Sequence, residues 1–131
     1  MINGATAPLL VRSFPIELTN GNDGRGSKWF RSSEIRKRIE SQLRALGEDR
    51  EPFEFPVRLK LTRVLGHNQR LWDNDSILRG SAKELIDALV AVGWFHDDGP
   101  KFITEVRGAQ EVPAERREPW TRATVWKDDE I

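Results

Sequence analysis

Four aspartates and one lysine gather in residues 70–98 of the sequence, RLWDNDSILRGSAKELIDALVAVGWFHDD. In chain order they are Asp73, Asp75, Lys83, Asp97 and Asp98. Carboxylates are natural ligands of magnesium and manganese, and these ions leave coordination sites to water and phosphate. A nearby lysine supplies a point charge for a phosphate oxygen or a leaving group. These residue types therefore favour metal-assisted chemistry on a phosphate ester.

A helix is predicted between the two pairs of aspartates. Ser81 and Glu84 have the S-x-x-E pattern of a capping box, which places the first helical residue at Ala82. Gly93 is a typical C-cap residue and is expected to end the helix. A helix of about a dozen residues spans ~18 Å. The segment from Asp73 to Gly80 must therefore return along the helix if the four acids are to act together. The buried face is expected to contain Ala82, Leu85, Ile86, Leu89 and Val90.

These acids also have an ordinary structural interpretation. Asp73 and Asp75 are good turn residues, and Asp97 with Asp98 precedes the dipeptide Gly99-Pro100 as a surface turn would. Like charges that lie close together cost stability unless a cation offsets their repulsion. A convergent cluster would thus indicate a cation site, whereas four separate turn residues would not. The spacing alone leaves both interpretations open.

The composition limits the class of protein. A chain of 131 residues suits one domain, and we expect a single domain over residues 1–131 with frayed tails at 1–8 and 127–131. The absence of cysteine excludes disulfides and thiolate metal sites, and two histidines argue against a His-rich zinc site. The sequence shows no signal peptide and no apolar run of membrane-spanning length. A soluble, cytoplasmic protein is expected.

The charges balance overall but are unevenly distributed. The 21 basic and 21 acidic residues give a net charge of zero, which counts against a DNA-binding domain because such domains are usually basic. Residues 25–44, however, are rich in arginine and lysine. The candidate DNA-contacting residues are Arg25, Lys28, Arg36, Lys37 and Arg70. A basic arm with an acidic pocket suits an enzyme that acts on a polyanion, and a plain loop and a solvated helix face are the alternatives.

The hydrophobic pattern predicts an α/β (α+β) domain with a mixed sheet and two helices in the order β, α, β, α, β, β. The strands are expected at residues 9–19, 57–65, 101–108 and 120–126, and the helices at 32–46 and 82–93. Ser32 or Ser33 would cap the first helix, and Gly47 would end it. Pro15 predicts a free edge or a bulge in the first strand. The polar run 110–119 is expected to be a loop, and Trp72 and Trp94 are expected in the core.

The stretch KELIDALVAVGWFHDD, from Lys83 to Asp98, resembles the RusA-type Holliday-junction resolvases of phages and prophages. In that family a D-x-D-N segment precedes a helix that begins K-x-x-x-D-A-L, and an aromatic-rich turn then leads to D-D. The residues that match in type and register are Lys83, Asp87, Ala88, Leu89, Gly93, Trp94, Asp97 and Asp98, with Asp73 and Asp75 on the D-x-D. The order of elements is similar over nearly the whole chain. Ser76 stands where the family usually has asparagine, and the segment 76–82 is longer, which one extra helical turn or a widened loop could absorb.

The resemblance implies a small homodimer that binds four-way DNA junctions and nicks opposing strands in recombination and repair. It implies magnesium, or manganese, held by Asp73, Asp75 and Asp98 with support from Asp97. Lys83 would meet the scissile phosphate, and Asp73, Asp75, Lys83 and Asp98 would be the catalytic residues. A catalytically inactive DNA-binding module of the same fold and a phage accessory domain that binds protein are the alternative functions.

Overall fold

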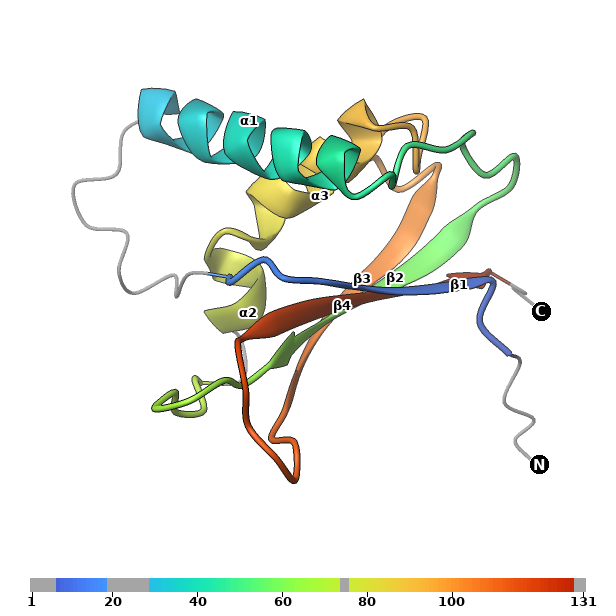
Figure 1. Cartoon of the computed structure of the whole chain (residues 1–131). Coiled ribbons are helices and arrows are strands. Elements are labelled where there is room, and N and C mark those ends of the chain that lie inside the picture. Colours follow the sequence, from blue (N-terminus) through green and yellow to red (C-terminus); the bar gives the residue numbers. More distant parts are fainter. Residues whose placement is uncertain (1–6, 19–28, 74–75, 129–131) are drawn as a thin grey trace.

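The computed structural model describes residues 7–18, 29–73 and 76–128. Its elements are β1 (Leu10–Phe14), α1 (Trp29–Ala45), β2 (Val57–Val64), α2 (Ser76–Arg79), α3 (Ala82–Ala91), β3 (Ile103–Glu111) and β4 (Trp120–Lys127). The predicted α+β class and element order are confirmed, and the short helix α2 adds one helical turn, one of the two arrangements expected for the segment 76–82 (Figure 1). In the described part of the chain, no helix is long and apolar enough to cross a membrane.

The strands form one four-stranded mixed sheet in the order β1-β4-β2-β3. β4 pairs antiparallel with both β1 and β2, whereas β2 and β3 are parallel. Parallel neighbours require a crossover connection, which α2 and α3 supply between β2 and β3. β1 is an edge strand and Pro15 follows its last residue, so the missing N–H group of this proline interrupts no ladder.

The helices lie on one face of the sheet (Figure 1), and the core fills the space between the two layers. α1 contributes Ile39 and Leu43 to it, both among the buried residues. Trp94 is 0% exposed, and its Nε1–H group donates to the carbonyl oxygen of Glu48 at 2.8 Å. The expected core position of Trp94 is thus confirmed, while Trp72 is partly buried against the core.

The start of α1 differs from the prediction. The helix begins at Trp29, so Ser32 and Ser33 are interior residues and the predicted serine caps are wrong. The hydroxyl of Ser32 donates instead to the carboxylate of Glu84 in α3. A contact between distant segments thus takes the side chain that a local cap would have used. Gly47 follows the helix with a φ of +75°, which agrees with its expected role at the helix end.

α3 begins at Ala82 as predicted, but no capping box forms. Ser81 makes no side-chain capping hydrogen bond, and the carboxylate of Glu84 accepts from Ser32 of α1 instead of supplying the reciprocal half of the box. The end of the helix is confirmed: Gly93 has a φ of +98°, and the N–H group of Trp94 donates to the carbonyl oxygen of Leu89 at 2.9 Å. This closed turn directs the chain back along the helix towards the second pair of aspartates.

Two strands end elsewhere than expected. β1 stops at Phe14, although Ile16 and Leu18 beyond it stay buried at 4% and 2% exposure. β3 continues to Glu111, so the start of the predicted loop 110–119 is wrong. Parallel pairing with β2 up to the Val64 position extends β3 through these polar residues, because it supplies hydrogen-bond partners to the backbone groups on that side of the strand. At the other end of the chain, β4 includes Lys127.

Candidate active site

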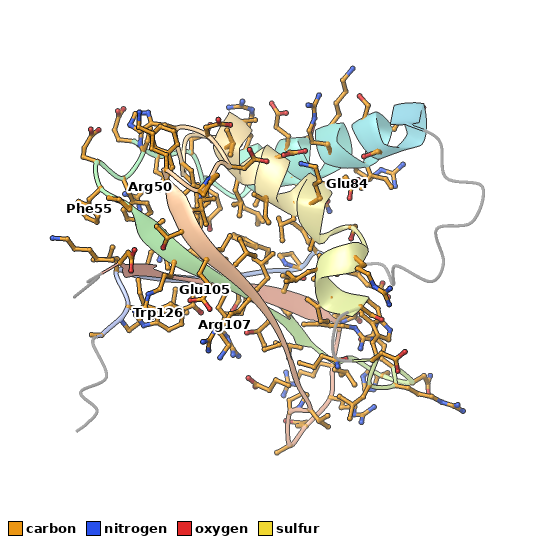
Figure 2. All side chains as sticks on the ribbon, turned by 180° about the vertical axis from the view of Figure 1, so that it is seen from behind. Arg50, Phe55, Glu84, Glu105, Arg107 and Trp126 are labelled. Carbon is orange, nitrogen blue, oxygen red and sulfur yellow. The ribbon has the colours of Figure 1, made fainter. Side chains whose placement is uncertain are left out.

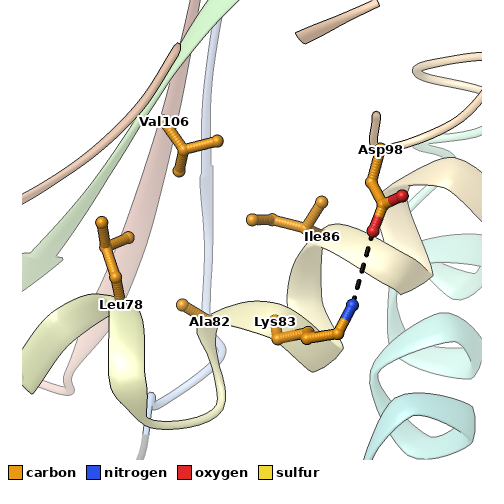
Figure 3. A pocket seen from close by; sticks show the side chains of 6 residues that line it. All are labelled: Leu78, Ala82, Lys83, Ile86, Asp98 and Val106. Carbon is orange, nitrogen blue, oxygen red and sulfur yellow. Dashed lines mark hydrogen bonds and ion pairs between the residues drawn. The ribbon is translucent and has the colours of Figure 1, made fainter. Parts of the chain in front are cut away.

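Lys83 lies between two carboxylates. Its Nζ atom is 3.5 Å from Oδ1 of Asp87, one turn later in α3, and 3.4 Å from Oδ2 of Asp98, which follows the helix (Figure 3). The lysine and Asp87 share one helix face because side chains four residues apart are neighbours. Asp98 reaches the same point because the turn at Gly93 reverses the chain. The structure therefore brings together three residues of the K-x-x-x-D and D-D patterns.

The carboxylates raise the pKa of Lys83. The charge of Asp87 makes the largest contribution, burial opposes it as the second-largest effect, and the hydrogen bond and charge of Asp98 raise the pKa further. The lysine side chain is 68% exposed, so solvent and ligands can reach it. A protonated, accessible lysine suits electrostatic contact with a phosphate oxygen and does not suit the role of a general base.

An open pocket of about 260 Å³ adjoins this ion pair. Its lining comes from α2, α3, β3 and the turn after α3 (Figure 3): Leu78, Ala82, Lys83, Ile86, Asp98 and Val106. Most of these side chains are apolar, and Lys83 with Asp98 supplies the charges. Gly108 permits the close approach of α2 to β3, since a Cβ atom there would lie 2.7 Å from Cβ of Ile77.

Asp97 and Asp98 have different contacts. Oδ1 of Asp97 accepts the backbone N–H group of Asp98 at 2.8 Å, so Asp97 shapes the turn. Asp98 directs its carboxylate at Lys83. The carbonyl oxygen of Gly99 then accepts from Ile103 at 2.9 Å and leads the chain into β3. One aspartate of the pair therefore orients the other.

A buried cluster fixes the chain just before Asp73. The guanidinium group of Arg63 lies 3.7 Å from the ring centre of Trp72 and donates to the carbonyl oxygen of Arg70 at 2.8 Å. The Gln110 amide accepts from the backbone N–H of Trp72 at 2.8 Å and donates to its carbonyl at 3.0 Å. Arg63 also donates to the Gln110 oxygen at 2.8 Å. The backbone that leads to the first predicted acid is thus tied to β2 and β3.

Sequence analysis missed Arg63 and Gln110 as residues of the site. One signal was available: Arg63 continues the alternating positions of Leu59 and Leu61, whose side chains face the core. An arginine at such a position needs partners inside the protein. Arg63 is 3% exposed, and burial lowers its pKa, while its cation stays paired with the carbonyl oxygens and the Trp72 ring. No comparable pattern pointed to Gln110.

Of the two aspartates that precede α3, the structure describes only Asp73. Asp73 is exposed, and its carbonyl oxygen accepts from the N–H group of Ser76 at 3.0 Å. Within residues 7–18, 29–73 and 76–128 its carboxylate has no ion pair, and no group of three or more His, Cys, Asp or Glu side chains is placed to hold a metal ion. Asp75 lies outside the described residues. The convergence of all four aspartates therefore stays a prediction.

Ser76, which stands in place of the family's asparagine, begins α2 and is 0% exposed. Its Oγ atom has no hydrogen-bond partner among the described residues. The helical turn α2 occupies residues 76–79, within the segment for which an extra turn or a widened loop was expected. Ser76 thus faces the interior of the protein, and its side chain is not exposed as a metal ligand would be.

The predicted DNA-contacting residues differ in exposure. Lys37 and Arg70 are exposed, and Arg36 is half-buried with a buried Nε atom that lacks a partner in the described part of the chain. Arg25 and Lys28 lie outside that part.

Comparisons with the models of protein families and with curated proteins found no significant match. The function must therefore be inferred from the residues themselves.

Proposed function

We propose that this protein is a magnesium-dependent endonuclease that resolves Holliday junctions or related branched DNA by paired nicking. The observation that carries the proposal is the ion pair between Lys83 and Asp98 at the rim of an open pocket, with an Nζ–Oδ2 distance of 3.4 Å. These two residues lie 15 positions apart, in the register of the resolvase-like motif. An isolated surface lysine or a plain turn would not require this contact.

Lys83 acts in this proposal on the scissile phosphate. Asp87 and Asp98 hold its ammonium group in place and raise its pKa further above neutral pH. A phosphate oxygen that enters the pocket competes with Asp98 for that group. As the P–O bond breaks, negative charge shifts among the phosphate oxygens and onto the leaving group. A cation fixed beside these oxygens therefore stabilises the transition state more than the bound substrate.

Asp73, Asp75 and Asp98 would hold the metal ion, and Asp97 would support them through its contact with the Asp98 backbone. Their chemistry fits the ion, since magnesium and manganese prefer oxygen ligands and the Asp98 side chain is 39% exposed. A bound ion would activate water and neutralise charge on the phosphate. The chain's own contribution upstream is the Arg63–Gln110–Trp72 cluster, which orients the backbone before Asp73.

DNA contact and symmetry complete the proposal. Phosphate contacts come from the basic residues Arg25, Lys28, Arg36, Lys37 and Arg70. Such contacts bind without regard to sequence and position the duplex on the protein. A homodimer would present two identical sites, which suits a two-fold symmetric junction that needs two cuts.

A nicking assay with the parent protein tests this function. The substrate is a synthetic four-way junction, the matched control substrate is a linear duplex of the same arm sequence, and each is incubated with magnesium or with EDTA. We expect nicks in the junction that require magnesium and that are symmetric across it. Gel shifts without metal measure binding in parallel.

A second function has one observation in its favour. Ser76, where the resolvases usually have asparagine, is buried beside the proposed acids, and this departure suits a module of the same fold that binds DNA without cutting it. Junction retention without nicking would select this alternative. A protein that neither binds nor cuts the junction would contradict both and favour the protein-binding domain.

A further inference from the structure

The face of the sheet opposite the helices carries no described helix (Figure 1), and its side chains are of two kinds. Tryptophans and cations project from three neighbouring strands. Figure 2 shows Trp126 and Arg107 on this face, on the side away from the helices. The residues that matter are Trp120, Trp126, Arg58, Lys60, Arg107 and Arg122, which we call the open face.

The alternation of side chains along the strands assigns these residues to the open face. In β2 the buried Val57 and Leu59 face the helices, so Arg58 and Lys60 face the other way. In β4 the buried Ala123 faces the helices by the same rule, which turns the even-numbered residues, including both tryptophans, outward. The register places Arg58 beside Trp126 and Lys60 beside Arg107.

The open face has an excess of positive charge. Its two carboxylates are already paired: Glu105 lies 2.7 Å from Nε of Arg107, and Glu111 lies 2.7 Å from an Nη atom of Arg122. Lys60, on the central strand, has no ion pair among the described residues, and Arg58 has a buried Nε atom without a hydrogen-bond partner there. The pKa of Glu111 is lowered, chiefly by its hydrogen bond from Arg122 and further by the charge of Lys60.

The two tryptophans stand at the two ends of the cationic region. Trp120 is the first residue of β4 and is 37% exposed, and Trp126 is the last but one residue of the strand. The rise of the strand over the six residue steps from Trp120 to Trp126 is roughly 20 Å. Proteins that bind single strands combine a positive surface along the backbone with aromatic rings on which bases stack. Both features are present here in one plane.

We propose that the open face is a binding platform for single-stranded DNA. The phosphates lie over Arg58 and Lys60, and bases stack on Trp120 and Trp126. A second copy of the chain is the less suitable occupant, because face-to-face packing would bury the unpaired cations of both copies against each other. The platform does not depend on the proposed nuclease. Val106 lines the pocket, whereas the next residue, Arg107, belongs to the opposite face.

Fluorescence anisotropy of a labelled oligo-dT of roughly 16 nucleotides, without divalent metal, tests the proposal. Trp126→Ala should weaken binding by roughly 5- to 150-fold, the effect of losing one stacked base, and Trp120→Ala should act in the same direction. Trp126→Phe keeps an aromatic ring and should restore most of the affinity. Lys60→Gln should reduce the slope of log K against log salt by about 0.7, the value for one phosphate contact with a single strand.

Arg38→Gln is the matched control, because it removes an exposed cation of α1 on the other side of the molecule, and it should leave oligo-dT binding unchanged. Circular dichroism verifies that each variant is folded, and Trp126→Phe keeps the test decisive if Trp126→Ala unfolds. No oligo-dT binding by the parent, or equal binding by parent and tryptophan variants, overturns the proposal. So does a concentration-dependent dimer that Trp126→Ala dissociates in sedimentation experiments while oligo-dT does not bind. Because nicking is measured separately with magnesium, failure of the platform and failure of the nuclease are distinguishable.

Discussion

The side-chain amide of Gln110 pairs with the backbone of Trp72 as a neighbouring strand would. It accepts from the N–H group at 2.8 Å and donates to the carbonyl oxygen at 3.0 Å, across 38 positions of sequence. Arg63 joins the pair through the same amide oxygen and the indole ring. This relationship holds the segment before Asp73 against β3, close in sequence to the acids that the proposed mechanism requires.

Gln110→Ala should destabilise the protein by about 1–3 kcal/mol, because it leaves partly buried donors of Trp72 and Arg63 without their acceptor. The midpoint of urea unfolding measures this, with an unchanged slope. The matched control is Gln42→Ala, an exposed glutamine in α1, which should change stability by no more than about 0.5 kcal/mol. Equal midpoints for the two variants would show that the cluster does not stabilise the fold.

Two glycines with positive φ provide a second comparison. At Gly47 a Cβ atom would meet nothing within 4 Å, so Gly47→Ala should cost only the left-handed conformation, about 1–2 kcal/mol. At Gly93 a Cβ atom would lie 2.0 Å from the carbonyl oxygen of Arg50, so Gly93→Ala must also displace the backbone. Thermal unfolding should therefore rank Gly93→Ala as clearly the less stable variant. A reversed or equal ranking would contradict the tight turn after α3.

The start of α3 at Ala82 agrees with the prediction, although the capping box behind that prediction does not form. The turn at Gly93 could be predicted because a glycine just after a helix is a local signal for a residue with positive φ. The apolar alternation of β2 was equally readable, since a period of two follows from strand geometry. The Glu84 half of the capping box is absent for a reason that lies outside the local sequence. Ser32 lies 52 positions before Glu84, and their contact exists only after α1 packs on α3. Local patterns carry no information on such a competition.

The contacts of the candidate site also differ in whether local sequence predicts them. The contact of Lys83 with Asp87 follows from helical spacing, whereas its contact with Asp98 depends on the turn at Gly93. Gln110 and Arg63 meet Trp72 only through the parallel pairing of β2 with β3, which no local signal encodes. Asp75 lies outside the described ranges, so its predicted place beside Lys83 stays a prediction.

The contribution of Lys83 to the free energy of unfolding should decrease at high pH. The folded-state pKa of Lys83 is raised, chiefly by Asp87, so the contribution is fully present below the unfolded pKa of about 10.4 and is lost as the pH rises through the folded pKa. The side chain is 68% exposed, which limits the contribution to about 1 kcal/mol or less. The difference in unfolding free energy between the parent and Lys83→Met measures it. This difference should be constant from neutral pH to about pH 9 and shrink above pH 10. A decrease between pH 6 and 8 would contradict the assignment.

The basic helix α1 should contact phosphates without reading sequence. Lys37→Gln should weaken junction binding equally for unrelated arm sequences and reduce the salt slope by about 0.9, the value for one duplex phosphate contact. Arg38→Gln, the neighbouring exposed arginine that is not among the proposed contacts, is the control. Gel shifts over a series of salt concentrations give both slopes. If the two variants behave alike, the face is an ordinary solvated surface.

The most direct test of the central claim is the single-turnover rate of junction nicking with magnesium, at protein concentrations that saturate binding. Lys83→Ala should reduce this rate by ~100-fold or more, and Asp98→Asn should abolish it, because Lys83 would contact the scissile phosphate and Asp98 would hold the metal ion. The control is Asp49→Asn, at an aspartate that pairs with Arg44 at 2.6 Å and is not part of the proposed site. This variant should nick at the parent rate. Parent-like rates for both Lys83→Ala and Asp98→Asn would contradict the claim that this ion pair is the catalytic centre.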